Sequence, residues 1–113
     1  MNAPEIMAEE QALVRRCVAG EPAACSTLFR QHQPRVRRVL ARFGATEDEL
    51  DDLVQETFVS IFKGLPRFKG RSRLSTWIYR VTAHTALAYK RQVGRQRERE
   101  DAYAETVRIH PHP

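Results

Sequence analysis

Acidic residues are missing from a long stretch of this chain, since no aspartate or glutamate occurs between Thr57 and Arg97. The same stretch is rich in basic residues, which are Lys63, Arg67, Lys69, Arg71, Arg73, Arg80, Lys90, Arg91, Arg95 and Arg97. The reverse holds from Phe43 to Glu56, which has no base and carries Glu47, Asp48, Glu49, Asp51, Asp52 and Glu56. With a net charge of +5, this segregation predicts two surfaces whose partners have opposite charge.

Long hydrophobic runs are also absent, and none approaches the roughly 20 residues that a membrane span needs. A secretory signal peptide is not expected, because Glu5, Glu9 and Glu10 lie where such a peptide carries bases. We therefore expect a cytoplasmic protein with no membrane partner. Its 113 residues are enough for one domain with a modest core.

Cysteine is scarce, with Cys17 and Cys25 as the only two in the chain. Both lie on predicted apolar helical faces, and a cytosol keeps thiols reduced, so we expect two free buried thiols. A redox pair is the alternative, but no CxxC motif supports it.

Catalytic and cofactor-binding patterns are lacking as well. The histidines lie apart in the chain, at His32, His84, His110 and His112. The last two belong to a proline-rich tail that offers no further metal ligands. Gly64 and Gly70 alone do not form a glycine-rich phosphate-binding loop. The sequence therefore predicts no enzyme activity, no catalytic residue, no metal site and no cofactor.

The apolar residues recur with helical rather than strand-like spacing, which predicts an all-α domain of four helices around one core. The first helix is expected over residues 4–18, with Val18 among its inward-facing residues. The second is expected over residues 22–43, with Phe29 on its apolar stripe and a kink or break at Pro34. The third covers residues 46–65 and is closed by a glycine and a proline.

The predicted third helix separates apolar from acidic residues. Its apolar side chains recur along one face, at Leu50, Leu53, Val54, Phe58, Ile61, Phe62 and Leu65. The opposite face carries Asp48, Asp51, Asp52, Gln55 and Glu56. Thr46 and Glu49 are three residues apart at its start and fit a capping box. This helix is expected to pack one face on the core and to present the other to a basic partner.

A short loop, PRFKGRSR, links this helix to a fourth one, and Gly70 is its expected hinge. Ser72 or Ser75 is expected to cap the fourth helix. The apolar stripe of that helix stops after Lys90, so any helical structure over residues 95–101 is expected to be solvated or frayed.

Aromatic residues are interleaved with the basic residues of the acid-free half, which favours a nucleic-acid surface. Basic side chains neutralise phosphates, and aromatic rings stack on unpaired nucleobases. Trp77 and Phe62 lie on inward-facing stripes, and we expect both in the core. Phe68 lies in the loop between Arg67 and Lys69, where it either contacts a nucleobase or packs beneath the loop.

Three segments of the chain stand out in order. They are LVRRCVAGEPAACSTLFRQHQPRVRRVLARF, DDLVQETFVSIF and RFKGRSRLSTWIYRVTAHTALAYKR. They resemble the opening helices, the most typical segment and the promoter-reading segment of region 2 of bacterial sigma factors, with the extracytoplasmic-function (ECF) class as the nearest match. The resemblance covers residues 11–92. It implies a sigma region 2-like helical domain over 1–92, followed over 93–113 by a charged helical extension and the start of an inter-domain linker.

The resemblance implies that the acidic helix docks on the clamp helices of the β′ subunit of core RNA polymerase. The residues at the matching positions are Asp51, Asp52, Gln55 and Glu56. An anti-sigma protein is a further expected partner. The chain ends before any region 4, and its proline-rich residues 111–113 favour a cut within the linker over the absence of that domain.

By the same resemblance, the loop and the fourth helix capture the −10 element of the non-template strand as single-stranded DNA, with one nucleobase flipped into the loop. The residues implied in DNA binding are Arg67, Phe68, Lys69, Gly70, Arg71, Ser72, Arg73, Arg80, His84, Lys90 and Arg91. Many family members carry asparagine where this chain has His84. An imidazole cannot pair bidentately with adenine as an amide does, so the base preference of the family does not carry over there.

The predicted function is therefore promoter −10 recognition and melting by an alternative (ECF) sigma factor that binds core RNA polymerase and directs transcription initiation. The alternative is a helical protein-interaction module without direct DNA binding, in which the basic half is merely solvated. Oligonucleotide binding that weakens strongly with salt would separate the two.

Overall fold

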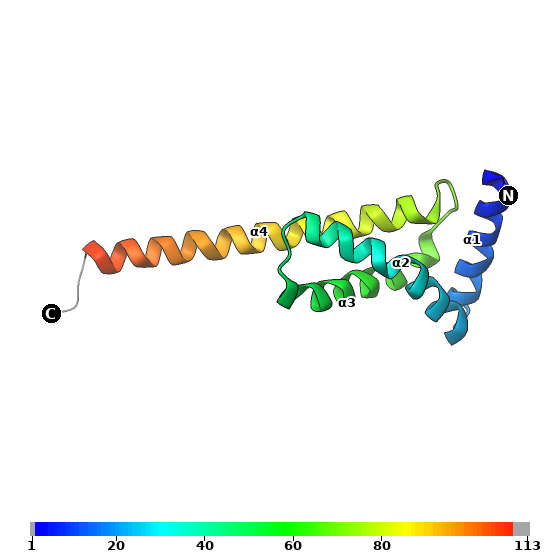
Figure 1. Cartoon of the computed structure of the whole chain (residues 1–113), viewed down its shortest axis with the longest axis horizontal. Coiled ribbons are helices and arrows are strands. Elements are labelled where there is room, and N and C mark those ends of the chain that lie inside the picture. Colours follow the sequence, from blue (N-terminus) through cyan, green and yellow to red (C-terminus); the bar gives the residue numbers. More distant parts are fainter. Residues whose placement is uncertain (1, 110–113) are drawn as a thin grey trace.

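The computed structural model describes residues 2–109, which form α-helices joined by short loops (Figure 1). The elements in chain order are α1 (Ala3–Val18), α2 (Pro22–Arg42), α3 (Glu47–Gly64), the short 3-10 helix η1 (Leu65–Arg67) and α4 (Leu74–Ile109). No strand occurs in this part of the chain. The prediction of an all-α fold is therefore confirmed. The predicted linker residues 111–113 and His110 lie outside the described range.

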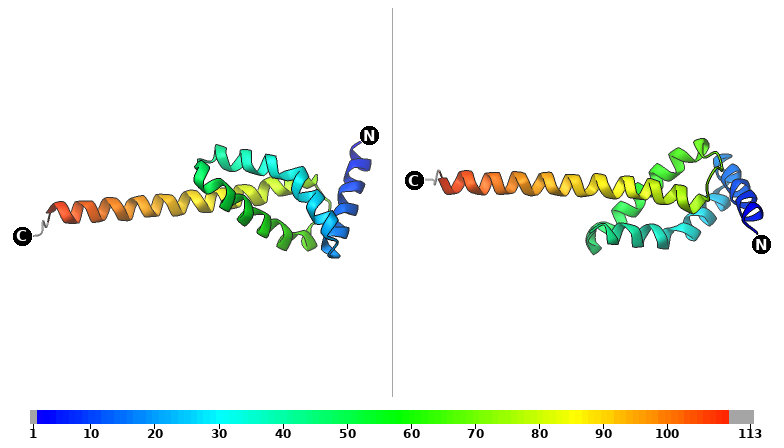
Figure 2. Two further views of the ribbon diagram at one scale, coloured as in Figure 1. Left: turned by 60° about the horizontal axis from the view of Figure 1, so that its bottom comes forward. Right: turned by 90° about the horizontal axis from the view of Figure 1, so that it is seen from above.

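The ends of the first two helices follow from local residue chemistry. Asn2 caps α1, and its Oδ1 accepts a hydrogen bond of 2.9 Å from the Glu5 N–H. Gly20 and Gly44 follow α1 and α2 with φ values of +93° and +100°, which glycine adopts without strain. α2 continues through Pro34 and bends along its length (Figure 2). A bend is expected, because proline removes one backbone hydrogen bond from the helix.

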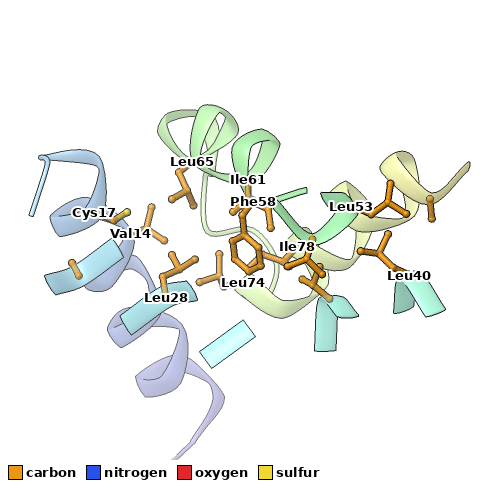
Figure 3. Close-up of a cluster of buried hydrophobic side chains, with 14 of the residues drawn as sticks. Val14, Cys17, Leu28, Leu40, Leu53, Phe58, Ile61, Leu65, Leu74 and Ile78 are labelled. Atoms are coloured by element: carbon orange, nitrogen blue, oxygen red, sulfur yellow. The ribbon is translucent and has the colours of Figure 1, made fainter. Parts of the chain in front are cut away.

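The core lies where α2, α3 and the first half of α4 meet, and the end of α1 covers one side of it (Figure 3). The apolar stripe predicted for the third helix is confirmed at Leu50, Leu53, Val54, Phe58 and Ile61 of α3 and at Leu65, the first residue of η1. Leu28 of α2 and Leu74 of α4 are completely buried against it. Burial of one such side chain stabilises the fold by about 1.5–3 kcal/mol. This core therefore fixes the relative positions of the helices that carry the site residues.

Burial departs from the sequence prediction at several helix positions. Val18 and Phe29, which were expected to face inward, are 47% and 40% exposed. The inner side of α4 includes Thr82 and Ala86, which the apolar pattern did not indicate. Thr82 is buried because its hydroxyl donates a hydrogen bond of 2.8 Å to the Ile78 carbonyl. Polar and small residues give little signal in a hydrophobicity pattern, although packing can place them between helices.

The predicted capping box at the start of α3 is wrong. Thr46 takes the N-cap position, but its hydroxyl makes no capping hydrogen bond. Its expected partner Glu49 interacts instead with the hydroxyl of Tyr89 on α4, and this interaction raises the pKa of Tyr89 above its usual value. The tertiary contact between α3 and α4 therefore replaces the local one.

The predicted serine cap of α4 is also wrong. The Ser72 hydroxyl donates to the Arg73 carbonyl at 3.2 Å, and Ser75 lies inside the helix. The Leu74 N–H at the start of α4 donates instead to Glu10 Oε2 of α1 at 3.0 Å. A side chain distant in sequence thus takes the place of a local cap.

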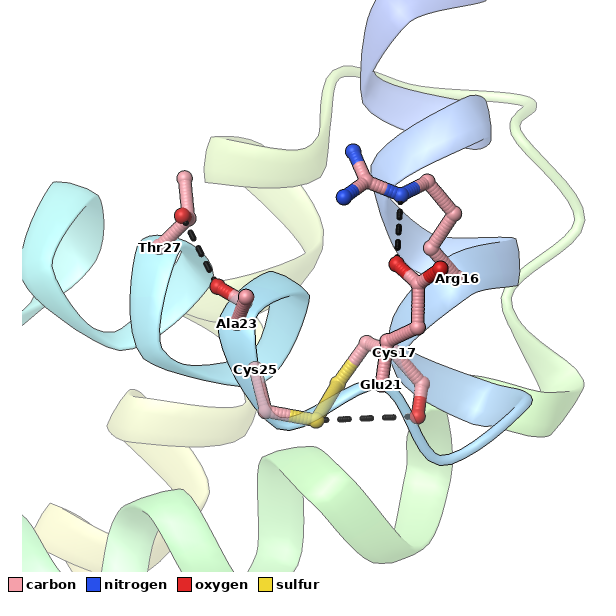
Figure 4. The surroundings of a disulfide bond; sticks show 6 residues. All are labelled: Arg16, Cys17, Glu21, Ala23, Cys25 and Thr27. Carbon is pink, nitrogen blue, oxygen red and sulfur yellow. Dashed lines mark hydrogen bonds and ion pairs between the residues drawn. A yellow bond between two sulfur atoms is a disulfide. The ribbon is translucent and has the colours of Figure 1, made fainter.

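The two cysteines are not free thiols, because the structure joins Cys17 and Cys25 in a disulfide (Figure 4). The turn at Gly20 places the last turn of α1 against the first turn of α2, with a Cα–Cα distance of 4.9 Å between the two cysteines. The Arg16–Glu21 ion pair of 2.6 Å spans the same turn. The prediction of free thiols is wrong, since this turn brings together two helical faces that sequence spacing alone left unrelated.

Helix α4 is longer than its apolar stripe predicts and continues to Ile109 (Figure 1). The side chains of residues 95–107 are exposed, so the solvated alternative holds for residues 95–101. The second half of α4 projects from the body, and the domain measures 71 × 26 × 24 Å along its principal axes. Within residues 2–109, none of the helices combines the length and the hydropathy that crossing a membrane requires.

Candidate nucleic-acid interface and acidic docking face

The acidic face of α3, which we define as Asp51, Asp52, Gln55 and Glu56, is exposed at every position. Arg37 of α2 pairs with Asp51 at an Nη1–Oδ1 distance of 2.7 Å, yet the Asp51 side chain remains 83% exposed. Exposed ion pairs are typically worth under about 1 kcal/mol. The three carboxylates therefore remain available to a basic partner.

An apolar hollow of about 390 Å³ lies beside the acidic face, between α2 and α3. Phe29, Phe58 and Phe62 line it, and the ring centroids of Phe29 and Phe58 are 4.7 Å apart. Val59 is 48% exposed at the hollow, and Asp51 belongs to its lining. The sequence prediction assigned Phe29 to the apolar stripe of its helix and missed this surface. Exposed apolar side chains next to charged ones are a common feature of protein interfaces.

The loop at residues 67–73 begins with the last residue of η1 and leads into α4, and Gly70 turns it with a φ of +71°. Phe68 packs beneath the loop, with its ring centroid 5.6 Å from that of Trp77. Packing beneath the loop is thus seen at Phe68, and contact of its ring with a nucleobase stays a prediction. Trp77 and Phe62 are partly buried against the core, as predicted.

The basic residues of the loop fall into two groups. Arg67, Lys69 and Arg71 have exposed side chains. Arg73 instead forms an ion pair, in which its Nε donates to Glu10 Oε1 at 2.8 Å. The positive charge that the loop presents to solvent therefore comes chiefly from Arg67, Lys69 and Arg71.

The helical periodicity of α4 places Arg80, His84 and Arg91 on one exposed side, away from the buried Ile78. Arg80 and Arg91 are about 16 Å apart along the helix axis, at a rise of about 1.5 Å per residue. Lys90 does not share this side, because its Nζ lies 5.9 Å from the centroid of the Phe43 ring. The exposed side of α4 thus continues the basic loop along the helix without Lys90.

Tyr79 of α4 and Arg35 of α2 lie close to the start of α4, and neither was among the predicted site residues. Tyr79 is 49% exposed and lines a shallow hollow together with Arg35, Ser75 and Thr76. An aromatic ring beside a guanidinium is suited to stacking on a nucleobase and to neutralising a phosphate. The sequence signal for Tyr79 was its place in the acid-free half. Arg35 lies outside the acid-free half, and only the fold brings α2 to this position.

His32 of α2 lies at the same end of the domain. Burial lowers the pKa of its imidazole, and the positive charges of Arg35 and Arg73 lower the pKa further, whereas the Glu10 carboxylate raises it. These groups come from α1, α2 and the residue that precedes α4. Among them, Glu10 and Arg73 form the ion pair that links α1 to the end of the loop.

The basic surface, which we define as loop residues 67–71 together with Arg80, His84 and Arg91, lacks internal charge neutralisation. Within residues 2–107, no acidic side chain forms an ion pair with Arg67, Lys69, Arg71, Arg80 or Arg91. The surface is therefore free to bind an external anion such as a phosphate backbone. The acidic face has the complementary chemistry and suits a basic helix.

Comparison with known proteins shows the family to which the chain belongs. The sequence profile described as Sigma-70 region 2 matches residues 28–96, which is more than half of the chain. The chain belongs to the sigma-70 region 2 family. The matched segment of this sigma region 2 domain includes the acidic face, the loop and the exposed side of α4.

Curated relatives of the domain are RNA polymerase sigma factors. The ECF RNA polymerase sigma-E factor of Haemophilus influenzae is 35% identical over 96 residues, covering 85% of this chain and 50% of the relative. The RNA polymerase sigma-H factor of Pseudomonas aeruginosa is 31% identical over 97 residues, covering 86% of this chain and 50% of the relative. The chain spans about half the length of these relatives. The predicted identity as region 2 of the ECF class is confirmed.

Two solved structures share the fold. An engineered region 2 of sigmaE, determined by NMR in complex with GTAAAA, is 31% identical with a TM-score of 0.69, covering 76% of this chain and 90% of that chain. CnrH, determined in complex with the cytosolic domain of CnrY, has a TM-score of 0.62 at 23% identity, covering 75% of this chain and 60% of that chain. The second likeness supports the fold alone.

Proposed function

We propose that this domain recognises and melts the promoter −10 element as part of an ECF sigma factor that binds core RNA polymerase and directs transcription initiation in the cytoplasm. The observation that carries the proposal is the occurrence of an exposed acidic face and an exposed basic surface within one sigma-70 region 2 match. Surfaces of opposite sign suit a domain that holds a protein and a nucleic acid at the same time.

The proposed polymerase contact is the acidic face, with the clamp helices of the β′ subunit as its partner. Exposed charge pairs are individually weak, but several carboxylates in a row steer and orient a basic helix. The apolar hollow beside them adds buried area, at roughly 25 cal/mol per Å² of apolar surface removed from water. We propose that the carboxylates align the partner helix on α3. Burial of the exposed Phe29 and Val59 then supplies much of the affinity for that helix.

The proposed strand contact begins at the loop. Extruding a nucleobase from the stack costs a few kcal/mol, which stacking and hydrogen bonds in the loop must offset. The exposed Lys69 and Arg71 suit the phosphates that flank the extruded nucleobase. The loop thus places positive charge on both sides of its turn at Gly70.

The strand then follows the exposed side of α4. Arg80 and Arg91 are the proposed phosphate contacts, and His84 between them meets a nucleobase edge with one donor and one acceptor at most. Tyr79 offers a ring for stacking near the loop. We leave Phe68 and Lys90 out of the direct contacts, because Phe68 packs on Trp77 and Lys90 lies over Phe43.

Binding of a fluorescent GTAAAA strand tests the proposal, since the similar engineered sigmaE region 2 was solved with that strand. Arg71→Ala combined with Arg80→Ala removes two proposed phosphate contacts. We expect binding weaker by on the order of 10-fold and a salt dependence shallower by about 0.7 per lost contact in log–log slope.

The matched control is Arg38→Ala combined with Arg42→Ala, which removes the same charge from exposed positions of α2. We expect the affinity of the control for the strand to be within about twofold of that of the unmodified chain, because the control changes only the overall electrostatic field of the domain. Equal losses from the two pairs would refute the assignment of the strand to the loop and α4.

A protein-interaction module without DNA contact is the alternative function, and similarity to sigma factors does not favour it. An anti-sigma protein remains a proposed partner on either account. The acidic face and the apolar hollow are surfaces that such a protein could cover. We propose no enzymatic activity for the domain.

A further inference from the structure

Helix α1 reaches the loop through one carboxylate. Arg73 Nε donates to Glu10 Oε1 at 2.8 Å, and the Leu74 N–H donates to Glu10 Oε2 at 3.0 Å. The Glu10 side chain is only 16% exposed, and Leu74 is completely buried. This carboxylate therefore satisfies an N–H that the start of α4 cannot pair internally, and it meets the positive end of the helix dipole.

The next residue of α1 contacts the middle of the loop. Gln11 Nε2 donates to the Lys69 carbonyl at 3.4 Å. The Gln11 side chain also occupies the space beside Gly70, where a β-carbon would collide with the Gln11 amide group. Glycine at this position therefore allows both the left-handed backbone and the approach of α1.

The loop has little internal support of its own. Within the described chain, the N–H groups of residues 69–72 donate no hydrogen bond to another backbone group. The contacts from Glu10 and Gln11 span 58 to 64 positions in sequence and hold the loop at its middle and at its end. The conformation of the loop thus depends on side chains of α1.

We propose that Glu10 and Gln11 are positioning residues for strand binding, which fix the loop before the strand arrives and do not touch it. This inference rests on the proposed function, in which the loop receives the flipped nucleobase. A loop that is already ordered loses less conformational entropy on binding. On this account Arg73 supports the loop through its pair with Glu10 and is not a phosphate contact.

The sign of a mutational effect separates positioning from simple charge repulsion. An acid close to DNA repels the phosphates, so its removal strengthens binding if repulsion is its only effect. If Glu10 holds the loop, its removal weakens binding even though the net charge becomes more positive. The dependence of binding on salt should then stay the same, because the phosphate contacts are elsewhere.

The experiment uses the 113-residue chain with Glu10→Ala, Gln11→Ala and, as a matched control, Glu9→Ala, whose carboxylate lies one residue away and is exposed. Binding of fluorescent GTAAAA is measured together with amide hydrogen exchange. We expect Glu10→Ala to weaken binding roughly fivefold or more, and Gln11→Ala to weaken it less. Glu9→Ala should leave binding unchanged or slightly tighter.

Hydrogen exchange provides the structural readout. The Leu74 amide should exchange at least about 10-fold faster in Glu10→Ala, because its acceptor is gone. The amides of Ile61 and Ile78 in the core should exchange at unchanged rates. If Glu10→Ala unfolds the domain, Glu10→Gln replaces it, since the amide oxygen still accepts from Leu74 while the pair with Arg73 is lost. An intermediate loss of binding is then expected.

Unchanged or tighter binding by Glu10→Ala, with the core intact, would overturn the inference. Unchanged exchange of the Leu74 amide would also overturn it. Failure of the unmodified chain to bind GTAAAA would instead contradict the proposed function. The hydrogen-exchange rate of the Leu74 amide would then be the measurement that decides whether α1 positions the loop.

Discussion

Two helical glycines have opposite surroundings. A β-carbon at Gly64, the last residue of α3, would lie 2.9 Å from the Trp77 ring. A β-carbon at Gly94, inside α4, would meet nothing within 4 Å. The Trp77 ring also packs against Phe68, with ring centroids 5.6 Å apart, so it has little freedom to move aside. The same substitution should therefore have opposite effects at the two positions.

We expect Gly64→Ala to lower the free energy of unfolding by about 1–3 kcal/mol, because the added methyl group displaces a packed ring. Gly94→Ala should raise the free energy of unfolding by about 0.5–1 kcal/mol, since alanine is the better helix former. Urea unfolding followed by circular dichroism measures both. An increase in the free energy of unfolding for Gly64→Ala would contradict the close packing of the Trp77 ring against Gly64.

The surroundings of His32 predict that the stability of the domain depends on pH. Burial, aided by Arg35 and Arg73 and opposed by Glu10, lowers its pKa below the ordinary value of 6.5. The unfolded chain therefore binds a proton more readily than the folded domain just below pH 6.5. The free energy of unfolding should fall as the pH drops through that region and should be insensitive to His32 above it.

Urea unfolding across this pH range tests the sign. His32→Gln should flatten the fall in stability, whereas His84→Gln, an exchange at an exposed position of α4, should leave the fall in place. A pH dependence that survives unchanged in His32→Gln would contradict the role given to burial at this residue.

Sequence predicted individual residues well where helical periodicity alone decides the outcome. Leu53 and Phe58 are buried because α3 has one clear apolar side. The burial of Phe29 was misjudged and the contact of Glu10 with the start of α4 was missed, because both depend on how helices pack against one another. The period of a single helix cannot tell whether its apolar edge is covered, and it cannot tell which distant side chain caps another helix.

Among the elements, α4 shows how hydrophobicity underestimates a helix. Its apolar stripe stops near Lys90, but the residues beyond are mostly arginine, glutamine and glutamate, which favour helix on their own. Gln96 Nε2 also donates to Glu100 Oε1 one turn later at 3.5 Å. The helix therefore continues through residues that bury nothing.

Helix α3 carries the prediction for the polymerase contact. Asp52→Arg combined with Glu56→Arg reverses two exposed charges of the acidic face and should weaken binding to the isolated β′ clamp helices by on the order of 10-fold or more. Glu98→Arg combined with Asp101→Arg makes the same charge change on the exposed part of α4 and serves as the control. If a titration gave the two variants equal affinity for the clamp helices, α3 would not be the docking element.

The whole molecule is a helical body with a protruding rod. Its Cα radius of gyration is 19.4 Å, whereas a compact domain of about this length has roughly 13 Å. The family match ends at residue 96, close to where α4 leaves the body. We keep residues 1–92 as the proposed domain and residues 93–113 as its extension.

Truncation tests this division. A chain that ends at Glu100 keeps all the core side chains that the structure describes, and its free energy of unfolding should change by less than about 0.5 kcal/mol. A chain that ends at Thr85 loses the buried Ala86 and the contact between Tyr89 and Glu49, and it should unfold at far lower urea concentration. Comparable stability of the two chains would show that the body does not end where proposed.

If the two oppositely charged surfaces of this domain serve different partners, charge variants of only one surface should weaken strand binding. With fluorescent GTAAAA, we expect clearly weaker binding by Arg71→Ala with Arg80→Ala. Binding by Asp52→Arg with Glu56→Arg should be unchanged or tighter, because the acidic face does not meet the strand. Equal loss of binding in both variants, or loss only in the second, would show that the two surfaces do not have separate partners.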